Sequence, residues 1–131
     1  MYLKKIHHVA KVVENISEEL KKYSSLGFII DNEIYTDLTQ KVKVGKVSTP
    51  EGIIIELLEP LNENSPIYNF SQKQKGFHHV CVEVKSIEKY LNFIKENNLG
   101  FQLTKITTCI FEKRKVCFIS TKDKEIIEIM E

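Results

Sequence analysis

The chain contains an internal repeat of about 72 residues, which restricts strongly the folds open to it. The segment IHHVAKVV at residues 6–13 is echoed by FHHVCVEV at residues 77–84, so that His8 corresponds to His79. The tripeptide LGF at residues 26–28 recurs at 99–101, and IIELLE at 54–59 recurs as IIEIME at 126–131. These landmarks keep register to within two residues. A period of this length predicts two copies of a half-domain rather than a solenoid.

Each copy predicts the same order of elements, a strand followed by a helix and three further strands. The expected helices run from Ser17 to Leu26 and from Ser86 to Leu99, where apolar residues follow helical spacing. A serine at or near the start of each helix is an N-cap candidate. Gly27 and Gly100 suit the left-handed position after a helix.

The remaining segments of each copy are typical of β-structure. They are extended segments at Phe28–Thr36 and Phe101–Ile110, β-branched stretches at 42–47 and 115–120, and final strands at 54–59 and 126–131. We therefore expect an α+β fold in which βαβββ modules at about 1–60 and 76–131 form one domain spanning residues 1–131. The linker at 61–75 is expected to hold a short helix at Ile67–Gln74, with Ser65 as cap and Pro66 at its first position.

Composition excludes several classes of function. A formal net charge of +1 provides no field that would attract nucleic acid or an anionic membrane. No apolar run approaches the roughly 18 residues of a membrane span, and the N-terminal residues show no signal-peptide pattern. Three cysteines without CxxC spacing predict neither a disulfide framework nor a zinc knuckle. We expect a cytoplasmic protein that acts on a small molecule.

The paired histidines must divide between the two faces of their strands. Because side chains alternate along a strand, His8 shares a face with Ala10, and His79 shares one with Glu83. His79 and Glu83 are expected on the face turned away from the helix. His7 and His78 then fall on the opposite faces, where a structural or supporting role is expected.

Two glutamates occupy equivalent positions among aliphatic residues in the last strand of each copy. Glu56 and Glu128 are costly to bury unless a partner offsets the loss of hydration. A divalent metal bound by these carboxylates together with His8 and His79 explains all four residues at once. Two imidazoles and two carboxylates form a mixed nitrogen and oxygen set that suits one Mn, Co, Ni or Zn ion.

The chain resembles the glyoxalase, or vicinal-oxygen-chelate, superfamily over essentially its whole length. Within that superfamily it is most similar to the methylmalonyl-CoA epimerases and the epimerase-like glyoxalase I proteins. The segments that carry the likeness are IHHV at 6–9, IELLEPL at 55–61, NSPI at 64–67, GFHHVC at 76–81 and IEIME at 127–131. The resemblance implies an incomplete β-barrel around a metal, often in a homodimer. It also implies the same four ligands, His8, Glu56, His79 and Glu128.

The chemistry implied by the resemblance is proton removal next to a carbonyl, with the metal spreading the resulting charge. Glu128 or Glu56 would act as the base. Returning the proton to the opposite face gives epimerisation. Returning it to the neighbouring carbon gives the alternative, glyoxalase I-type (lactoylglutathione lyase) isomerisation of a thiol hemithioacetal.

The chain departs from the epimerase pattern at two positions. Epimerases of the family usually carry Asp where His7 stands, and an acidic residue where this chain has Thr39. That acid is a candidate for one of two opposed bases, and Glu33 and Asp37 are its acidic neighbours. By the internal repeat Gln40 corresponds to Glu112, which makes Glu112 the second candidate catalytic residue.

Other residues suggest substrate contacts. Glu83 lies on the expected cavity face, and Arg114 belongs to a basic stretch suited to a phosphate of an acyl-CoA. Two further functions stay open: a non-catalytic small-molecule-binding protein of the same superfamily, and a dioxygenase. Sequestering members generally lack the full ligand set, and a dioxygenase would be expected to use two histidines and one glutamate. Metal-dependent isomerisation is therefore the favoured prediction.

Overall fold

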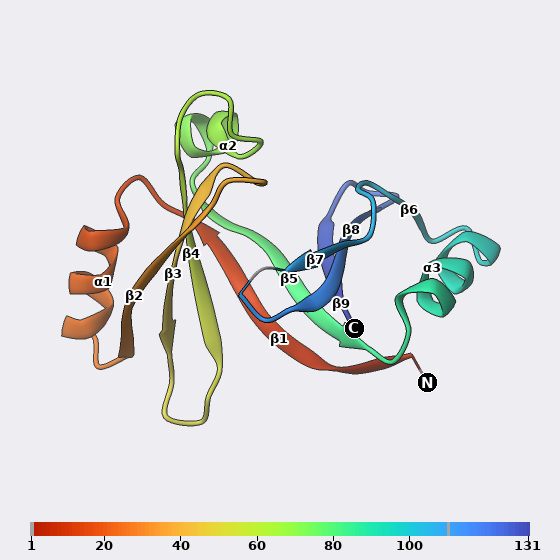
Figure 1. Cartoon of the computed structure of the whole chain (residues 1–131), viewed down its shortest axis with the longest axis horizontal. Coiled ribbons are helices and arrows are strands. Elements are labelled where there is room, and N and C mark those ends of the chain that lie inside the picture. Colours follow the sequence, from red (N-terminus) through yellow and green to blue (C-terminus); the bar gives the residue numbers. More distant parts are fainter. Residues whose placement is uncertain (1, 110) are drawn as a thin grey trace. The chain divides into compact units, whose positions relative to one another are not determined.

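The computed structural model describes residues 2–109 and 111–131, and it confirms the predicted order of elements in both modules. Ile110, at the end of the second extended segment, lies outside the described residues. The elements are β1 Leu3–Val12, α1 Ile16–Ser25, β2 Ile29–Asp37, β3 Val42–Ser48, β4 Ile54–Pro60, α2 Tyr68–Lys73, β5 Gly76–Val84, α3 Ile87–Glu96, β6 Gly100–Gln102, β7 Thr107–Cys109, β8 Arg114–Thr121 and β9 Ile126–Met130 (Figure 1).

The chain divides into two compact units, and the divisions between them lie within β1 and β5. One unit comprises His8–His78, and the other combines Met1–His7 with His79–Glu131. The start of β1 therefore belongs with the second module. There the Tyr2 carbonyl accepts a hydrogen bond from the Lys85 amide, and the Tyr2 ring stacks on Phe93 with centroids 4.8 Å apart.

The unit His8–His78 is built on strands in the order β2-β3-β4-β1. β4 is antiparallel to β3 and parallel to β1. A parallel pair needs a long crossover connection, which α1, β2 and β3 provide here. Helix α1 lies against β2, β3 and β4 (Figure 1). The core on this helix-covered face consists of Val13, Ile16, Tyr23, Val47 and Leu57. The opposite face is left for functional side chains.

The second unit repeats this arrangement with β5-β9-β8-β6, and β7 also pairs with β8. Its helix α3 packs on a core of Val84, Ile87, Ile94, Cys117, Ile119 and Ile129. The edge strand is split into β6 and β7, whereas its counterpart β2 is continuous with a register shift between Asp31 and Tyr35. Each set of strands is open at its edge, and the tandem βαβββ fold of the α+β class is confirmed.

The helix ends follow the predictions only in part. Ser86 caps α3 by accepting a hydrogen bond from the Lys89 amide at 3.3 Å, but α1 is capped by Asn15 rather than by Ser17. Gly27 has the expected left-handed backbone with φ of 95°. The prediction for Gly100 is wrong, because α3 ends earlier and Asn98 takes the left-handed conformation, with φ of 54°.

Gly100 is required for a different reason. A Cβ atom at this position would lie 2.2 Å from the carbonyl oxygen of Ser120, where β6 approaches β8. The linker helix α2 is also shorter than predicted and begins without a side-chain cap. Ser65 instead accepts a hydrogen bond from the Ile67 amide at 3.4 Å, in the turn before the helix.

Two repeated glutamates hold the helices to the sheets. A Glu59 carboxylate oxygen accepts a hydrogen bond from the Ile16 amide at 2.9 Å, and Glu131 does the same for the Ile87 amide at 2.9 Å. A carboxylate at a helix start satisfies an exposed amide and interacts favourably with the helix dipole. Among the described helices, none is long and apolar enough to cross a membrane.

Candidate metal centre

The first His–Glu pair lies on the face of the sheet that α1 leaves uncovered. Ala10 faces Glu56 in the parallel ladder between β1 and β4, and His8 lies two residues before Ala10 on the same side. His8 Nε2 and Glu56 Oε2 are 3.6 Å apart. The two side chains are 3% and 19% exposed. The predicted alternation therefore brings one imidazole and one carboxylate together in this unit.

The second pair has the same construction. Cys81 faces Glu128 in the parallel ladder between β5 and β9, and His79 lies two residues before Cys81. His79 Nε2 and Glu128 Oε1 are 3.3 Å apart, and the two side chains are only 4% and 10% exposed. The Phe118 ring meets the His79 ring edge to face at 5.1 Å. The two units are thus similar both in their strands and in the distance between the histidine and glutamate side chains.

The two distances can be compared with those between two ligands on one metal ion. Ligand atoms that each lie about 2.1 Å from the same ion are about 3.0–3.4 Å apart, depending on the coordination geometry. The 3.3 Å separation of His79 and Glu128 falls within this range, and the 3.6 Å separation of His8 and Glu56 lies slightly above it. Each pair offers an imidazole nitrogen and a carboxylate oxygen. The donor set within each unit therefore suits half of a mixed nitrogen and oxygen metal site.

A second polar group in the unit that contains His79 is centred on Arg114. Its Nη1 lies 2.6 Å from Glu83 Oε1, and it also lies 3.8 Å from Glu112 Oε2. The hydrogen bond from Arg114 holds the pKa of the buried Glu83 carboxyl below its usual value. Glu83 and Arg114, both predicted substrate contacts, are therefore bonded to each other. Their role towards a substrate stays a prediction.

Glu112 is held from a second side by a histidine. His7 Nε2 and Glu112 Oε2 are 3.0 Å apart. A ring nitrogen of His7 also lies within 4.8 Å of the Cys81 sulfur. His7 is thus part of the polar group around Glu112. The sequence had not indicated a contact between these two residues. The other supporting histidine, His78, meets the Phe70 ring of α2 at 4.9 Å.

The three cysteines are free thiols. Cys81 is buried with Val116 and Met130, as expected for a small core residue. Burial raises the pKa of the Cys117 thiol to about 11, and the charge of the neighbouring Glu128 adds to the rise. Cys117 is therefore a protonated core residue at neutral pH.

The turn between β2 and β3 holds the position where an acid was expected from the resemblance. Thr39 is exposed there. Of its acidic neighbours, Asp37 accepts a hydrogen bond from the Gln40 amide at 3.0 Å, and Glu33 accepts one from the Tyr35 hydroxyl. Both carboxylates are therefore engaged within their own segment.

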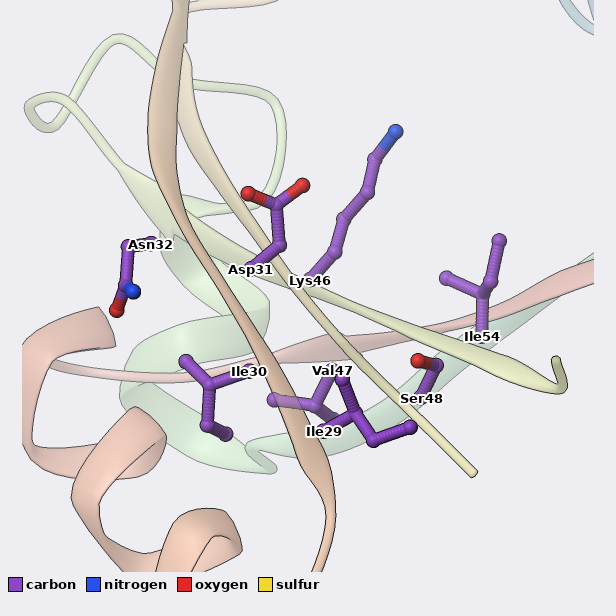
Figure 2. A pocket seen from close by; sticks show the side chains of 8 residues that line it. All are labelled: Ile29, Ile30, Asp31, Asn32, Lys46, Val47, Ser48 and Ile54. Carbon is purple, nitrogen blue, oxygen red and sulfur yellow. The ribbon is translucent and has the colours of Figure 1, made fainter. Parts of the chain in front are cut away.

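A residue that sequence reasoning missed is Lys46 on β3. It stands directly opposite Glu56 in the antiparallel ladder, and opposite Asp31 on its other side. It lines a pocket of about 400 Å³ in which the Asp31 and Lys46 side chains project to the same side of the strands (Figure 2). The alternation of β3 was the available signal, because Lys46 interrupts an apolar face that carries Val42 and Val44.

Comparisons with known proteins agree on the fold. The sequence model of the Glyoxalase/Bleomycin resistance protein/Dioxygenase superfamily matches residues 7–118. The mitochondrial methylmalonyl-CoA epimerase of Dictyostelium discoideum is 31% identical over 97 residues, which cover 72% of this chain but only 58% of that protein.

Two solved structures cover nearly the whole chain. A hypothetical protein of Bacillus halodurans is 31% identical with a TM-score of 0.85, over 97% of this chain and 93% of that one. The methylmalonyl-CoA epimerase of Mycobacterium tuberculosis has a TM-score of 0.86 at 20% identity, over 98% of this chain and 88% of that one. At that identity the second likeness concerns the fold alone.

Proposed function

Because the chain belongs to the glyoxalase/bleomycin resistance protein/dioxygenase superfamily, we propose that it is a metal-dependent isomerase with a reaction like that of methylmalonyl-CoA epimerase. The observation that carries the proposal is the pair of equivalent His–Glu contacts, one in each compact unit. Their equal construction supports a shared function. We propose that His8, Glu56, His79 and Glu128 bind one divalent ion of Co, Ni, Zn or Mn.

When bound by these four side chains, a divalent ion would supply Lewis-acid charge that makes a proton next to a carbonyl more acidic. Glu128 is the proposed base. Its side chain is more buried than that of Glu56, and a carboxylate removed from water is a stronger base. The Phe118 ring packs edge to face against the neighbouring His79 ring.

Epimerisation also needs a proton carrier for the other face of the substrate carbon. We assign this role to Glu112, which is held by His7 at 3.0 Å and lies within 3.8 Å of Arg114. This assignment replaces the acid that is absent at Thr39. Arg114 and Glu83 are proposed to border the bound substrate.

The proposed substrate is an acyl-CoA thioester, because the relatives in Dictyostelium discoideum and Cereibacter sphaeroides are epimerases of such compounds. The proposal further includes a homodimer, as in members of the superfamily, and a cytoplasmic location, for which the three free thiols give support. Light scattering on the purified protein tests the dimer, which has twice the 15.3 kDa mass of one chain.

The deciding experiment follows proton exchange in deuterium oxide. The protein is loaded in turn with Co, Ni, Zn or Mn, and methylmalonyl-CoA is monitored by NMR for loss of its α-hydrogen. The hemithioacetal of methylglyoxal and glutathione is offered in parallel. Exchange in methylmalonyl-CoA supports the proposal, and turnover of the hemithioacetal alone would replace it with glyoxalase chemistry. Inactivity on both, with metal bound, would favour a binding protein.

The Glu128→Gln substitution tests the proposed role of Glu128 as the base. It keeps the size of the side chain but removes its basic charge, so we expect exchange to fall by at least about 100-fold. Metal content by mass spectrometry of the protein should also fall. Glu125→Gln, an exposed position on the turn before β9, is the matched control and should behave as wild type. Undiminished exchange in Glu128→Gln would contradict the role.

A further inference from the structure

The outer edge of the second unit is formed by strand β6, with helix α3 beside it (Figure 1). β6 is the last strand in the order β5-β9-β8-β6, so one of its edges pairs with no strand of the described chain. The Leu103 amide donates a hydrogen bond to the Phe118 carbonyl at 2.8 Å, which continues the β6–β8 ladder beyond β6. Because bonded and non-bonded residue pairs alternate in an antiparallel ladder, the main-chain groups of Gly100 and Gln102 point to the open edge. Such an edge can accept a further strand.

Three large apolar side chains follow one another along this edge. Leu99, Phe101 and Leu103 are 46%, 57% and 45% exposed. Phe101 lies opposite Ser120 in the ladder, on the face turned away from α3, since the next residue Ile119 belongs to the core beneath that helix. The alternation of an extended chain places Leu99 and Leu103 on the same face as Phe101. Single exposed apolar residues are common, but a row of three at an open edge is typical of an interaction surface.

The other face of this edge carries a stripe of α3 side chains with opposite charges at its two ends. Glu88, Leu91, Asn92 and Lys95 follow helical spacing, and together with β6 they line a pocket of about 570 Å³. Glu88 and Lys95 are both exposed, and they lie about 10 Å apart along the helix axis. A twofold axis through the centre of the stripe therefore places Glu88 of one copy of the chain against Lys95 of another. The stripe is complementary to itself in charge.

We propose that β6 and α3 form the contact between two copies of this chain, in which the two β6 strands pair antiparallel about a twofold axis at Phe101. This pairing sets the Phe101 rings of the two copies opposite each other, and sets Leu103 of one copy opposite Leu99 of the other. Gly100 and Gln102 then supply the main-chain hydrogen bonds between the copies. The inference rests on the proposed homodimer and identifies its surface, and it does not depend on the proposed reaction.

The complementarity of this edge to itself favours a second copy over an unrelated partner. Apolar side chains meet apolar side chains on one face, and opposite charges meet on the other. Lys105, the only charged residue among residues 99–106, lies beyond the paired residues, so like charges do not meet at the centre. A peptide from another protein could bond to the β6 main chain, but it would not explain the order of charges along α3. Pairing of two copies accounts for both faces and also covers the pocket beside α3.

Exchange of charges across the twofold axis tests the arrangement. Sedimentation velocity over a range of protein concentrations gives the dissociation constant of the dimer. Glu88→Lys alone and Lys95→Glu alone each place like charges opposite each other at both ends of the contact, so each should weaken the dimer by at least about 10-fold. An equal mixture of the two single variants should associate as wild type does, because opposite charges meet again in the mixed dimer. The double variant should also regain the wild-type affinity.

A substitution at the axis tests the strand pairing. Phe101→Asp places two carboxylates opposite each other and should weaken the dimer by at least about 100-fold. The Gln102 amide, followed by hydrogen exchange in NMR spectra, should exchange slowly in the wild-type dimer and rapidly in this variant. Ile53→Asp is the matched control, because Ile53 is 56% exposed in the turn before β4 and should leave the dimer unchanged. Thermal unfolding confirms that each variant is folded.

The possible outcomes are distinct. A wild-type dimer that persists in Glu88→Lys and in Phe101→Asp would overturn the inference and leave the homodimer to another surface. Single variants that fail to associate on mixing, or a Gln102 amide that exchanges rapidly in the dimer, would also overturn it. A monomeric wild type would overturn the inference and the homodimer together, and leave the edge to a different partner. Proton exchange in methylmalonyl-CoA, followed in the same preparations, tests the reaction separately.

Discussion

Glu83 is a buried carboxylate whose hydrogen-bond partner Arg114 is nearly one-third exposed, with side-chain exposures of 8% and 28%. Removing the arginine would leave a buried charge without its nearest cation, whereas removing the carboxylate would leave a guanidinium that water can reach. The two single substitutions are therefore unequal in their expected cost.

We expect Arg114→Met to destabilise the protein by about 3 kcal/mol, and Glu83→Gln by less. Urea unfolding at pH 7 provides the measurement. The double variant should recover part of the loss, because it no longer buries an unpaired charge. Additive effects of the two substitutions would show that the pair is not energetically coupled.

The same pair predicts a pH dependence of stability. Because Arg114 lowers the pKa of Glu83 below its ordinary value of 4.5, the folded protein binds this proton less tightly than the unfolded chain. The stabilisation is complete above about pH 4.5 and is lost as pH falls through the folded pKa. Unfolding curves from pH 6 to pH 3 should decline less steeply in Glu83→Gln than in wild type.

At the scale of the elements, the helices depend on carboxylates from the last strands. Glu59→Ala and Glu131→Ala each remove an acceptor at 2.9 Å from a helix-start amide. We expect each to cost about 1 kcal/mol in thermal or urea unfolding. Glu51→Ala, at an exposed turn before β4, serves as control. If only one of the two substitutions lowered stability, the two equivalent glutamate contacts would not contribute equally to the free energy of unfolding.

Many of the helices and strands were predictable from the sequence, because they follow from the spacing of nearby residues. Alternation along β1 and β5 selected His8 and His79, which lie 3.6 Å from Glu56 and 3.3 Å from Glu128, respectively. The end of α3 was not predictable in the same way. Gly100 follows an apparent helix stop, yet its constraint comes from Ser120 on another strand.

The neighbourhood of Glu112 shows the same limit of sequence reasoning. Symmetry selected Glu112 as a candidate, but its contacts with His7 and Arg114 join segments far apart in the sequence. Lys46 was overlooked although β3 had been identified, because its meaning depends on its register against Glu56. To predict contacts between strands, one must know which strands pair and in which register. The residue pattern of a single strand does not give this.

For the whole molecule, the two His–Glu pairs predict a coupling between metal and stability. If both compact units contribute ligands to one ion, metal binding should stabilise the folded chain by about 2.7 kcal/mol at 100 times the dissociation constant. Calorimetry before and after chelation, with Co or Zn added back, provides the measurement. Addition of metal to the Glu128→Gln variant should give a smaller rise in the unfolding temperature. An unfolding temperature that is indifferent to metal would contradict the shared site.

The division of β1 has a consequence for dissecting this protein into pieces. Residues 2–7 belong with the second module, where Tyr2 stacks on Phe93, so a fragment containing only residues 76–131 lacks part of its own compact unit. The repeat visible in the sequence is thus not a pair of separable building blocks. A fragment of residues 76–131, expressed alone, should require a peptide of residues 2–7, added in trans, to regain its native packing.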